Sequence, residues 1–458
     1  MTGPIPDATS NRDEFVRAAV VPRDPSSPSH ASGTLHTAQA MLLAEPTLAV
    51  RDIHTGAVLG DDAAVRTFLA TDPALATAKS PPYDWDALTH LCFSRYLRLD
   101  AAKSDGFVRA ARALLDAGAD ANTGFYETDH SPTPVYEPVL YGAAGVAHHE
   151  GLTRLLLERG ADPNGDEVPY HSPEEYDLGA FIALLESPRL TADSLSTMLL
   201  RKSDWHDIDG MRLTLDRGAD ANKAGQWGAT PLAHAIRSDN RTGIVELLLD
   251  RGADPRLVNR GLTPVAMAAR AGRADLLALF ADRGAPVSTL VGVNALVAAC
   301  AQNDADGAAR IVAASPALVD ELRALGALLM VRFASNKNGR GIERLLELGV
   351  PVNAAEPNGE GYLERAKNST ALHVAAWRTR HEVVRLLIAR GADVNARNAS
   401  NQSPLMLAVK ANVDSYWTEE ASTESIEALL AAGASLSGVR YPSGYEPADA
   451  LLRAHGAR

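Results

Sequence analysis

The protein has 458 residues, of which 57 are acidic and 44 are Lys or Arg, so its formal net charge is -13. This balance argues against a general nucleic-acid or anionic-membrane binder, because both partners select a basic surface. The two cysteines, Cys92 and Cys300, exclude a disulfide framework and a multi-cysteine metal site. They fit a reducing compartment, and we expect a cytoplasmic protein.

The first 35 residues differ from the rest of the chain. They carry several Pro and Ser residues, with one predicted helix over residues 13–20. We expect this segment to be partly ordered and docked on the first structural unit. It lacks the apolar stretch of a signal peptide, and no uncharged apolar run of about 18 residues predicts a membrane-spanning helix.

A short pattern then recurs: apolar residues, two variable residues, and Gly-Ala-Asp, often followed by Asn. The first full copy ends in Gly118-Ala119-Asp120, and later copies centre on Gly160, Gly218, Gly252, Gly284, Gly349, Gly391 and Gly433. Weaker copies, with Pro near the Gly position, lie at residues 43–48, 68–75, 184–190 and 311–319. The shortest spacings are close to a period of about 33 residues. Only 5% of the residues are aromatic, which favours many narrow Ala- and Leu-packed seams over one large core.

A second pattern marks the start of the repeated unit. Thr230-Pro231, Thr263-Pro264 and Ser403-Pro404 each combine a good N-cap residue with Pro at the first helical position. Gly272 and Gly284 are predicted to end helices in the left-handed conformation. Together the patterns resemble the ankyrin-repeat family. The resemblance implies an all-α solenoid of about eleven helix pairs over residues 36–440, with a closing segment at 441–458. We place any offset between its halves near residues 285–335.

In ankyrin-like arrays the first helices and the loop tips line a concave groove, so long loops are candidates for ligand contact. Loops 122–136, 164–177 and 353–367 are stretched, and the first two are rich in Tyr, His, Asp and Glu. We therefore predict that residues 92–209 form the functional part of the groove. The candidate binding residues are Arg95, Tyr96, Tyr126, His130, Tyr136, Tyr141, His148, His149, Glu167, Tyr170, His171, Lys202, Asp204, Trp205 and His206.

Several candidates have a structural alternative. Either His148 or His149 could be the turn histidine that ankyrin repeats often carry. Asp204 and Asp207 could cap the following helix, and Trp205 could pack at its edge. The loop tyrosines could fold back on their own loops.

The resemblance implies a scaffold that binds a protein or a polar ligand of positive or mixed charge. The alternative is an enzyme or small-molecule binder with a Tyr/His/Asp-lined pocket over the same repeats, since a site assembled from several repeats leaves no contiguous motif. The spacing of the histidines predicts no metal site. We expect no cofactor, no nucleic-acid or membrane partner, and a monomer.

Overall fold

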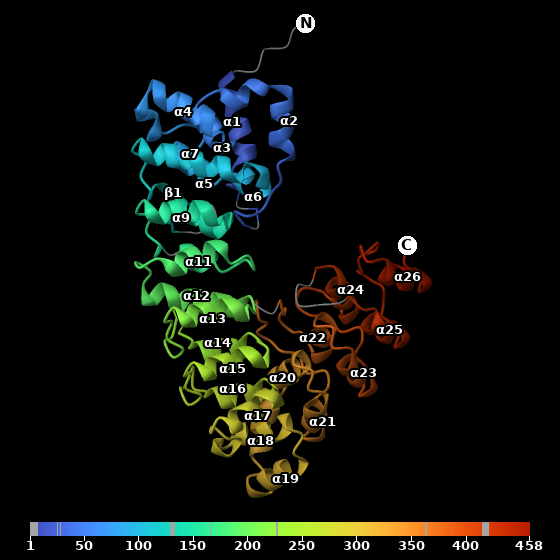
Figure 1. The fold of residues 1–458 in the computed structure, drawn as a ribbon. Helices are drawn as coiled ribbons and strands as arrows, with labels where there is room; N and C mark the ends of the chain where they lie inside the picture. Colours follow the sequence, from blue (N-terminus) through green and yellow to red (C-terminus); the bar gives the residue numbers. More distant parts are fainter. Residues whose placement is uncertain are drawn as a thin grey trace. The chain divides into compact units, whose positions relative to one another are not determined.

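Helices make up most of the chain in the computed structural model, which describes residues 8–24, 26–27, 29–128, 133–165, 167–225, 228–361, 364–414 and 421–458 (Figure 1). Its contacts divide the chain into two compact units, Met1–Gln226 and Trp227–Arg458. This division does not fall near residues 285–335, where we expected an offset. The helices of that region, which include the apolar Val293–Ala301, all belong to the second unit and contact its other helices.

The described residues of the first unit form five helix pairs. These are α3 (Ile53–Val58) with α4 (Asp62–Thr71), α5 (Ala87–Cys92) with α7 (Ser104–Asp116), α8 (Val139–Tyr141) and the π-helical turn η4 (Gly142–Val146) with α9 (Glu150–Glu158), α10 (Glu167–His171) with α11 (Gly179–Glu186), and α12 (Ala192–Asp204) with α13 (Ile208–Asp216). The remaining elements are α1 (Ala8–Ala19), α2 (His36–Ala44), α6 (Arg95–Leu99), the hairpin strands β1 (Gly124–Glu127) and β2 (Val135–Pro138), and the short turns η1 (Pro46–Val50), η2 (Pro73–Ala76) and η3 (Ala101–Lys103).

The described residues of the second unit form six further pairs, so the predicted solenoid of about eleven pairs is confirmed. The six are α14 (Pro231–Arg237) with α15 (Thr242–Asp250), α16 (Pro264–Arg270) with α17 (Ala274–Asp282), α18 (Val293–Ala301) with α19 (Ala305–Ala314), α20 (Leu318–Ser335) with α21 (Gly339–Glu347), α22 (Ala371–Trp377) with α23 (His381–Ala389), and α24 (Pro404–Asp414) with α25 (Glu424–Ala431). The turn η5 (Val287–Thr289) precedes α18, and α26 (Glu446–Ala454) ends the unit. No helix in the described part of the chain is long and apolar enough to cross a membrane.

Local sequence signals set the helix ends. The Thr230 and Thr263 hydroxyls accept hydrogen bonds from backbone N–H groups in the first turns of α14 and α16, and Pro occupies the first position of each helix. Gly272 follows α16 with φ +71°, a conformation that glycine adopts without a steric cost. The weaker repeat copies behave in the same way, since α11 ends before Ser187-Pro188 and α19 ends before Ser315-Pro316.

The N-terminal helix is longer than expected. It begins at Ala8, whereas the sequence predicted a start at Asp13. Its residues Phe15, Val16 and Ala19 are fully buried in the core of the first unit. An apolar face of this kind explains how a segment outside the repeats joins the same core.

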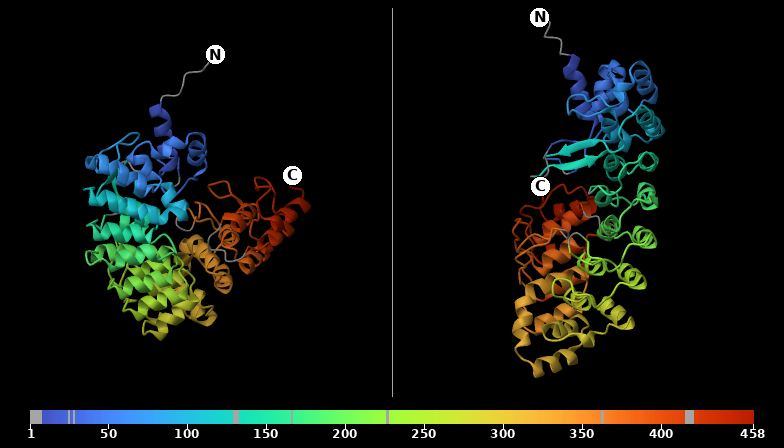
Figure 2. Two further views of the ribbon diagram at one scale, coloured as in Figure 1. Left: turned by 45° about the horizontal axis from the view of Figure 1, so that its top comes forward. Right: turned by 90° about the vertical axis from the view of Figure 1, so that its left-hand side faces the viewer.

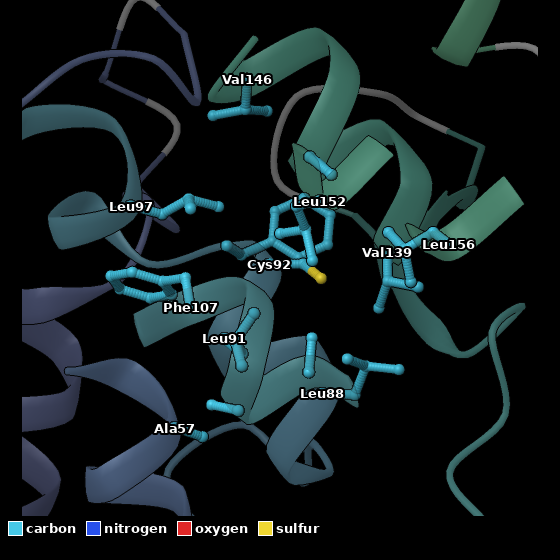
Figure 3. Close-up of a cluster of buried hydrophobic side chains, with 14 of the residues drawn as sticks. Ala57, Leu88, Leu91, Cys92, Leu97, Phe107, Val139, Val146, Leu152 and Leu156 are labelled. Carbon is cyan, nitrogen blue, oxygen red and sulfur yellow. The ribbon is translucent and has the colours of Figure 1, made fainter. Parts of the chain in front are cut away.

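The core of the first unit is a series of narrow seams between helices, shown around Cys92 in Figure 3. Leu91 of α5 lies beside Phe107 of α7, and Leu88 and Cys92 belong to the same buried cluster. A Cβ atom on Gly142 would lie 2.7 Å from the Cys92 carbonyl oxygen, so the neighbouring inner helices meet at a position that admits only glycine without a shift. Small residues therefore set the spacing of the seam, as the low aromatic content suggested.

The second unit has a buried polar centre. Asp239 follows α14, and its side chain is fully buried. Its carboxylate lies 3.1 Å from an Arg332 nitrogen and accepts hydrogen bonds from the Ser335 hydroxyl (2.8 Å) and the Asn336 amide (3.0 Å), all on or next to α20. Burial alone would raise the pKa of Asp239, but Arg332 and Arg378 outweigh it and lower that pKa. One buried carboxylate thus ties α14 to α20.

Candidate functional site

The first stretched loop forms a two-stranded antiparallel hairpin, which the sequence did not predict. Phe125 pairs with Glu137 and Tyr126 pairs with Tyr136, and Figure 2 (right) shows the two strands side by side. A side chain at Gly124 would collide with the Glu137 carbonyl oxygen, so glycine permits the close pairing of the strands. Because side chains alternate along a strand, each face of the hairpin has its own set of residues.

One face of the hairpin is exposed. Tyr126 is 64% exposed and Tyr136 is 40% exposed, and their ring centroids lie 5.1 Å apart. The Tyr136 hydroxyl donates a hydrogen bond to the Asn122 carbonyl oxygen at 2.8 Å. The two tyrosines therefore stand together on the surface, and one of them is fixed in place by its own loop.

The opposite face is buried against the N-terminal segment. Phe125 stacks on Trp85 with centroids 4.4 Å apart, and the Arg23 guanidinium lies 4.7 Å from the Phe125 centroid. The buried Glu127 carboxylate lies 3.6 Å from Arg23 Nε and 2.9 Å from His30 Nε2. Two basic side chains from the N-terminal segment thus compensate one buried carboxylate of the hairpin.

Tyr141 of α8 links this layer to the next repeat. Its hydroxyl lies 3.1 Å from His30 Nδ1, and its ring centroid lies 5.2 Å from that of His171. Burial raises the pKa of Tyr141 well above its ordinary value. The Tyr141 hydroxyl therefore stays protonated at neutral pH.

His171, at the end of α10, lies between two carboxylates. Its Nε2 is 3.0 Å from Glu167 and its Nδ1 is 3.0 Å from Glu174. Burial alone would lower the pKa of His171, but the hydrogen bonds to Glu167 and Glu174 outweigh it and raise the pKa to about 9. His171 is therefore a partly buried cation at neutral pH, with both ring nitrogens engaged.

Glu137 lies on the buried face beside this network. Burial, with the charges of Glu167 and Glu127, raises the pKa of Glu137 to about 8. Its Oε2 atom is buried without a hydrogen-bond partner. Glu137 is consequently a neutral acid near pH 7, the least satisfied member of the cluster.

Two neighbouring cations of α12 complete the network. Arg201 lies 4.2 Å over the Tyr170 ring and forms ion pairs with Glu174 and, at 2.8 Å, with Asp204. The fully buried Lys202 places Nζ 2.7 Å from the Asp207 carboxylate. The cluster therefore joins α10, α12 and the following turn through paired charges.

The other candidates lie outside this cluster. His149 caps α9, since its Nδ1 accepts a hydrogen bond from the Leu152 N–H group at 3.1 Å, whereas His148 adopts φ +48° in the preceding turn. Trp205 ends α12 and His206 follows it with φ +53°. In α6, Tyr96 is buried with its hydroxyl unpartnered, and Arg95 donates to the Ala18 carbonyl oxygen. His130 lies outside the described residues.

Replacing His149 with Ala should lower the free energy of unfolding by about 1 kcal/mol, because α9 loses its N-cap. The His149 ring also lies 2.7 Å from the Ser104 hydroxyl of α7. Chemical denaturation of H149A and of H149N measures the loss. Since asparagine is a good N-cap, H149N should restore most of the stability, and equal losses in the two variants would exclude capping as the role of His149.

The structure thus brings together six of the predicted candidates: Tyr141, Glu167, Tyr170, His171, Lys202 and Asp204. It adds Arg23, His30, Glu127, Glu137, Glu174 and Arg201, which sequence reasoning did not select. The alternation of buried and exposed side chains along the two strands was a usable signal for Glu127 and Glu137. The contacts of Arg23 and His30 with the hairpin leave no signal in a single sequence, because about a hundred residues separate the partners.

A polar cavity of about 460 Å³ lies beside this cluster in the first unit. It is lined by Asn164, Pro169, Thr191, Asp193, Ser194, Ser196, Thr197, Ala224 and Gly225. Hydroxyl and amide groups dominate the lining, and none of the predicted Tyr, His or Asp candidates contributes to it. The titratable cluster and the cavity are therefore separate features.

Two family models match the chain: ankyrin repeats (3 copies) over residues 329–437, and ankyrin repeats (many copies) over residues 215–268. An L-asparaginase from Dirofilaria immitis is 27% identical over 214 residues, which are 43% of this chain and 33% of that protein. The ankyrin repeat and KH domain-containing protein mask-1 from Caenorhabditis elegans is 26% identical over 191 residues, 40% of this chain and 7% of that protein.

The chain spans well under two thirds of the length of either relative. The sequence similarity to these two relatives is therefore confined to part of each protein. The stacked helix pairs, their Thr-Pro starts and glycine ends, and the two family matches agree with one another. The chain contains ankyrin repeats, which the family models match over residues 215–268 and 329–437.

Proposed function

We propose that the first unit binds a basic protein segment on the exposed face of the hairpin β1–β2. Ankyrin repeats generally mediate protein–protein interaction. The observation that carries the proposal is the exposed pair Tyr126 and Tyr136 on a strand pair whose other face is sealed. Tyrosine supplies a large contact area at a low cost in conformational entropy, and it is enriched in the energetic centres of interfaces.

The charge near the hairpin favours a basic partner. Asp120 and Asp162 are exposed in the turns that flank the hairpin repeat. Burial, followed by the charges of Asp120 and Asp86, raises the pKa of Tyr136, so both carboxylates act on that ring. With a chain net charge of -13, a positively charged segment would be attracted to this surface.

The hydrogen bonds that the cluster histidines, His171 and His30, make with other protein groups favour a binding role over acid–base catalysis. Both ring nitrogens of His171 and both of His30 are engaged by protein groups. A general base needs a nitrogen within reach of a substrate proton. These histidines therefore fit the role of fixing the hairpin and the N-terminal segment better than the role of acting on a ligand.

The double variant Y126A/Y136A should weaken binding of a basic segment by about tenfold or more, as expected for interface tyrosines. The melting temperature should change little, because both side chains are exposed. The measurement is fluorescence anisotropy with extended peptides that differ only in net charge, from acidic to basic. A preference for basic peptides, lost in the double variant, is the expected result.

Tyr176 provides the matched control. It is 63% exposed but lies outside the hairpin, where its hydroxyl donates to the Trp205 carbonyl oxygen. Y176A should retain the binding of the original protein. If Y176A weakens binding as much as Y126A/Y136A, or if charge has no effect on affinity, the hairpin is not the recognition surface.

A further inference from the structure

A second feature of the first unit is a basic pocket beside the N-terminal segment. It has a volume of about 450 Å³ and is lined by Arg17, Pro22, Arg23, Asp24, Ser26, Ser27, Tyr83 and Arg95. Three of these side chains are positively charged and one is negatively charged. Such an excess of positive charge is unusual in a protein whose net charge is -13.

Carboxylates neutralise only part of the positive charge of the pocket. Arg23 lies near Glu127, and Asp24 accepts a hydrogen bond from the Ser26 N–H group, so these two charges are engaged within the protein. Across the described residues, neither Arg17 nor Arg95 lies within ion-pair distance of a carboxylate. The same holds for Arg98, one turn from Arg95 on α6.

Arg95 is held in a fixed position. One of its terminal nitrogens donates to the Ala18 carbonyl oxygen at 2.9 Å and lies 3.5 Å from the Thr34 carbonyl oxygen. Its guanidinium packs against Gly33 so closely that a Cβ there would lie 2.7 Å from Arg95 Cζ. The Nε atom of Arg95 is buried without a hydrogen-bond partner. A guanidinium that is fixed by neutral carbonyl groups and has no carboxylate partner among the described residues is suited to an anionic ligand.

Arg17 lies on the other side of the pocket and is more exposed than Arg95. It is exposed on α1, and its guanidinium lies 5.2 Å from the centroid of the Tyr83 ring. Burial and the neighbouring Arg95 charge lower the pKa of Arg98, while burial lowers that of Arg95, as expected where positive charges lack a counter-ion. The side chains on both sides of the pocket would therefore gain from an anion.

We propose that the pocket lined by Arg17, Arg95 and Tyr83 binds a phosphate monoester or inorganic phosphate. Arginine matches the geometry of phosphate through paired N–H groups, and a doubly charged oxyanion balances two arginines. Ser26 and Ser27 also line the pocket. The site is distinct from the exposed tyrosines of the hairpin, so it adds to the proposed binding of a basic segment and does not depend on it.

Isothermal titration of the full-length protein tests the proposal with three probes: inorganic phosphate, a phosphoserine peptide, and the same peptide with serine. We expect phosphate and the phosphopeptide to bind and the serine peptide not to bind, with an affinity that falls as salt rises. Tighter binding of the phosphopeptide than of inorganic phosphate identifies a protein-borne phosphate as the source. Equal affinities identify free phosphate.

The variant R17Q should weaken phosphate binding by about tenfold or more, the usual loss for a hydrogen bond to a charged group. Arg17 is exposed, so R17Q should fold normally, whereas R95Q also removes the contacts with Ala18 and Thr34. Arg112, exposed on α7, is the matched control, and R112Q and Y126A/Y136A should both bind phosphate like the original protein. Failure of both phosphate probes to bind, equal binding of the serine peptide, or equal losses in R17Q and R112Q would overturn the proposal.

Discussion

Replacing Glu137 with Gln should stabilise the protein above pH 8, with little effect near pH 4.5. The pKa of Glu137 is about 8 in the folded protein and 4.5 in an ordinary environment. The folded state therefore holds the proton more tightly, so the contribution of Glu137 to stability falls as pH rises from about 4.5 to about 8. At 1.36 kcal/mol per pKa unit, the gain in E137Q reaches at most about 5 kcal/mol.

The measurement is the free energy of unfolding of the original protein and of E137Q, from urea titrations at several pH values between 5 and 9. The difference should grow with pH and level off above pH 8. E127Q is the matched control, because Glu127 is paired with His30 and Arg23. Removing its charge should destabilise the protein near neutral pH. Parallel pH profiles for the original protein and E137Q would show that the pKa of Glu137 does not change on folding, which would contradict its raised value in the structure.

The variant D239N should destabilise the second unit by about 3 kcal/mol or more, the usual loss when one partner of a buried ion pair is removed. Arg332 would keep its charge in the interior without the Asp239 carboxylate. Asparagine suits the test because Asp239 has φ +54°, a left-handed conformation that Asn tolerates well. The variant therefore changes the charge without adding backbone strain.

Denaturant unfolding followed by circular dichroism measures this loss. Glu424 is the control, since it forms a 2.8 Å ion pair with Arg385 in which both side chains are about half exposed. E424Q should change stability far less than D239N, because water screens exposed pairs. Equal effects of D239N and E424Q would mean that the buried ion pair contributes no more than a surface pair.

The fold was predictable because its signals are local. Thr230 and Thr263 lie next to the proline that follows each cap, and Gly272 needs only its own backbone conformation to end a helix. Even the altered copies at Ser187-Pro188 and Ser315-Pro316 kept a recognisable helix end. A repeat architecture stacks such local units, so local signals extend over most of the chain.

The candidate cluster was only partly predictable, because its charges pair over long sequence distances. His171 and Glu167 are one helical turn apart, so their association was visible in the sequence. The hydrogen bond between His30 and Glu127 and the ion pair of Arg201 with Glu174 depend on how the repeats stack. The sequence indicated an exposed loop where the hairpin lies. In the structure the N-terminal segment covers one face of the hairpin, so Glu127 and Glu137 are buried there.

Each unit contains one buried cysteine, and the labelling of that cysteine reports local unfolding of its unit. Cys92 is buried in the first unit and Cys300 in the second, and burial raises the pKa of each thiol. Alkylating reagents attack the thiolate, so labelling requires local unfolding around that sulfur. Mass-spectrometric labelling rates at the two sites should therefore separate the variants: E137Q should slow modification of Cys92 at alkaline pH, and D239N should speed modification of Cys300.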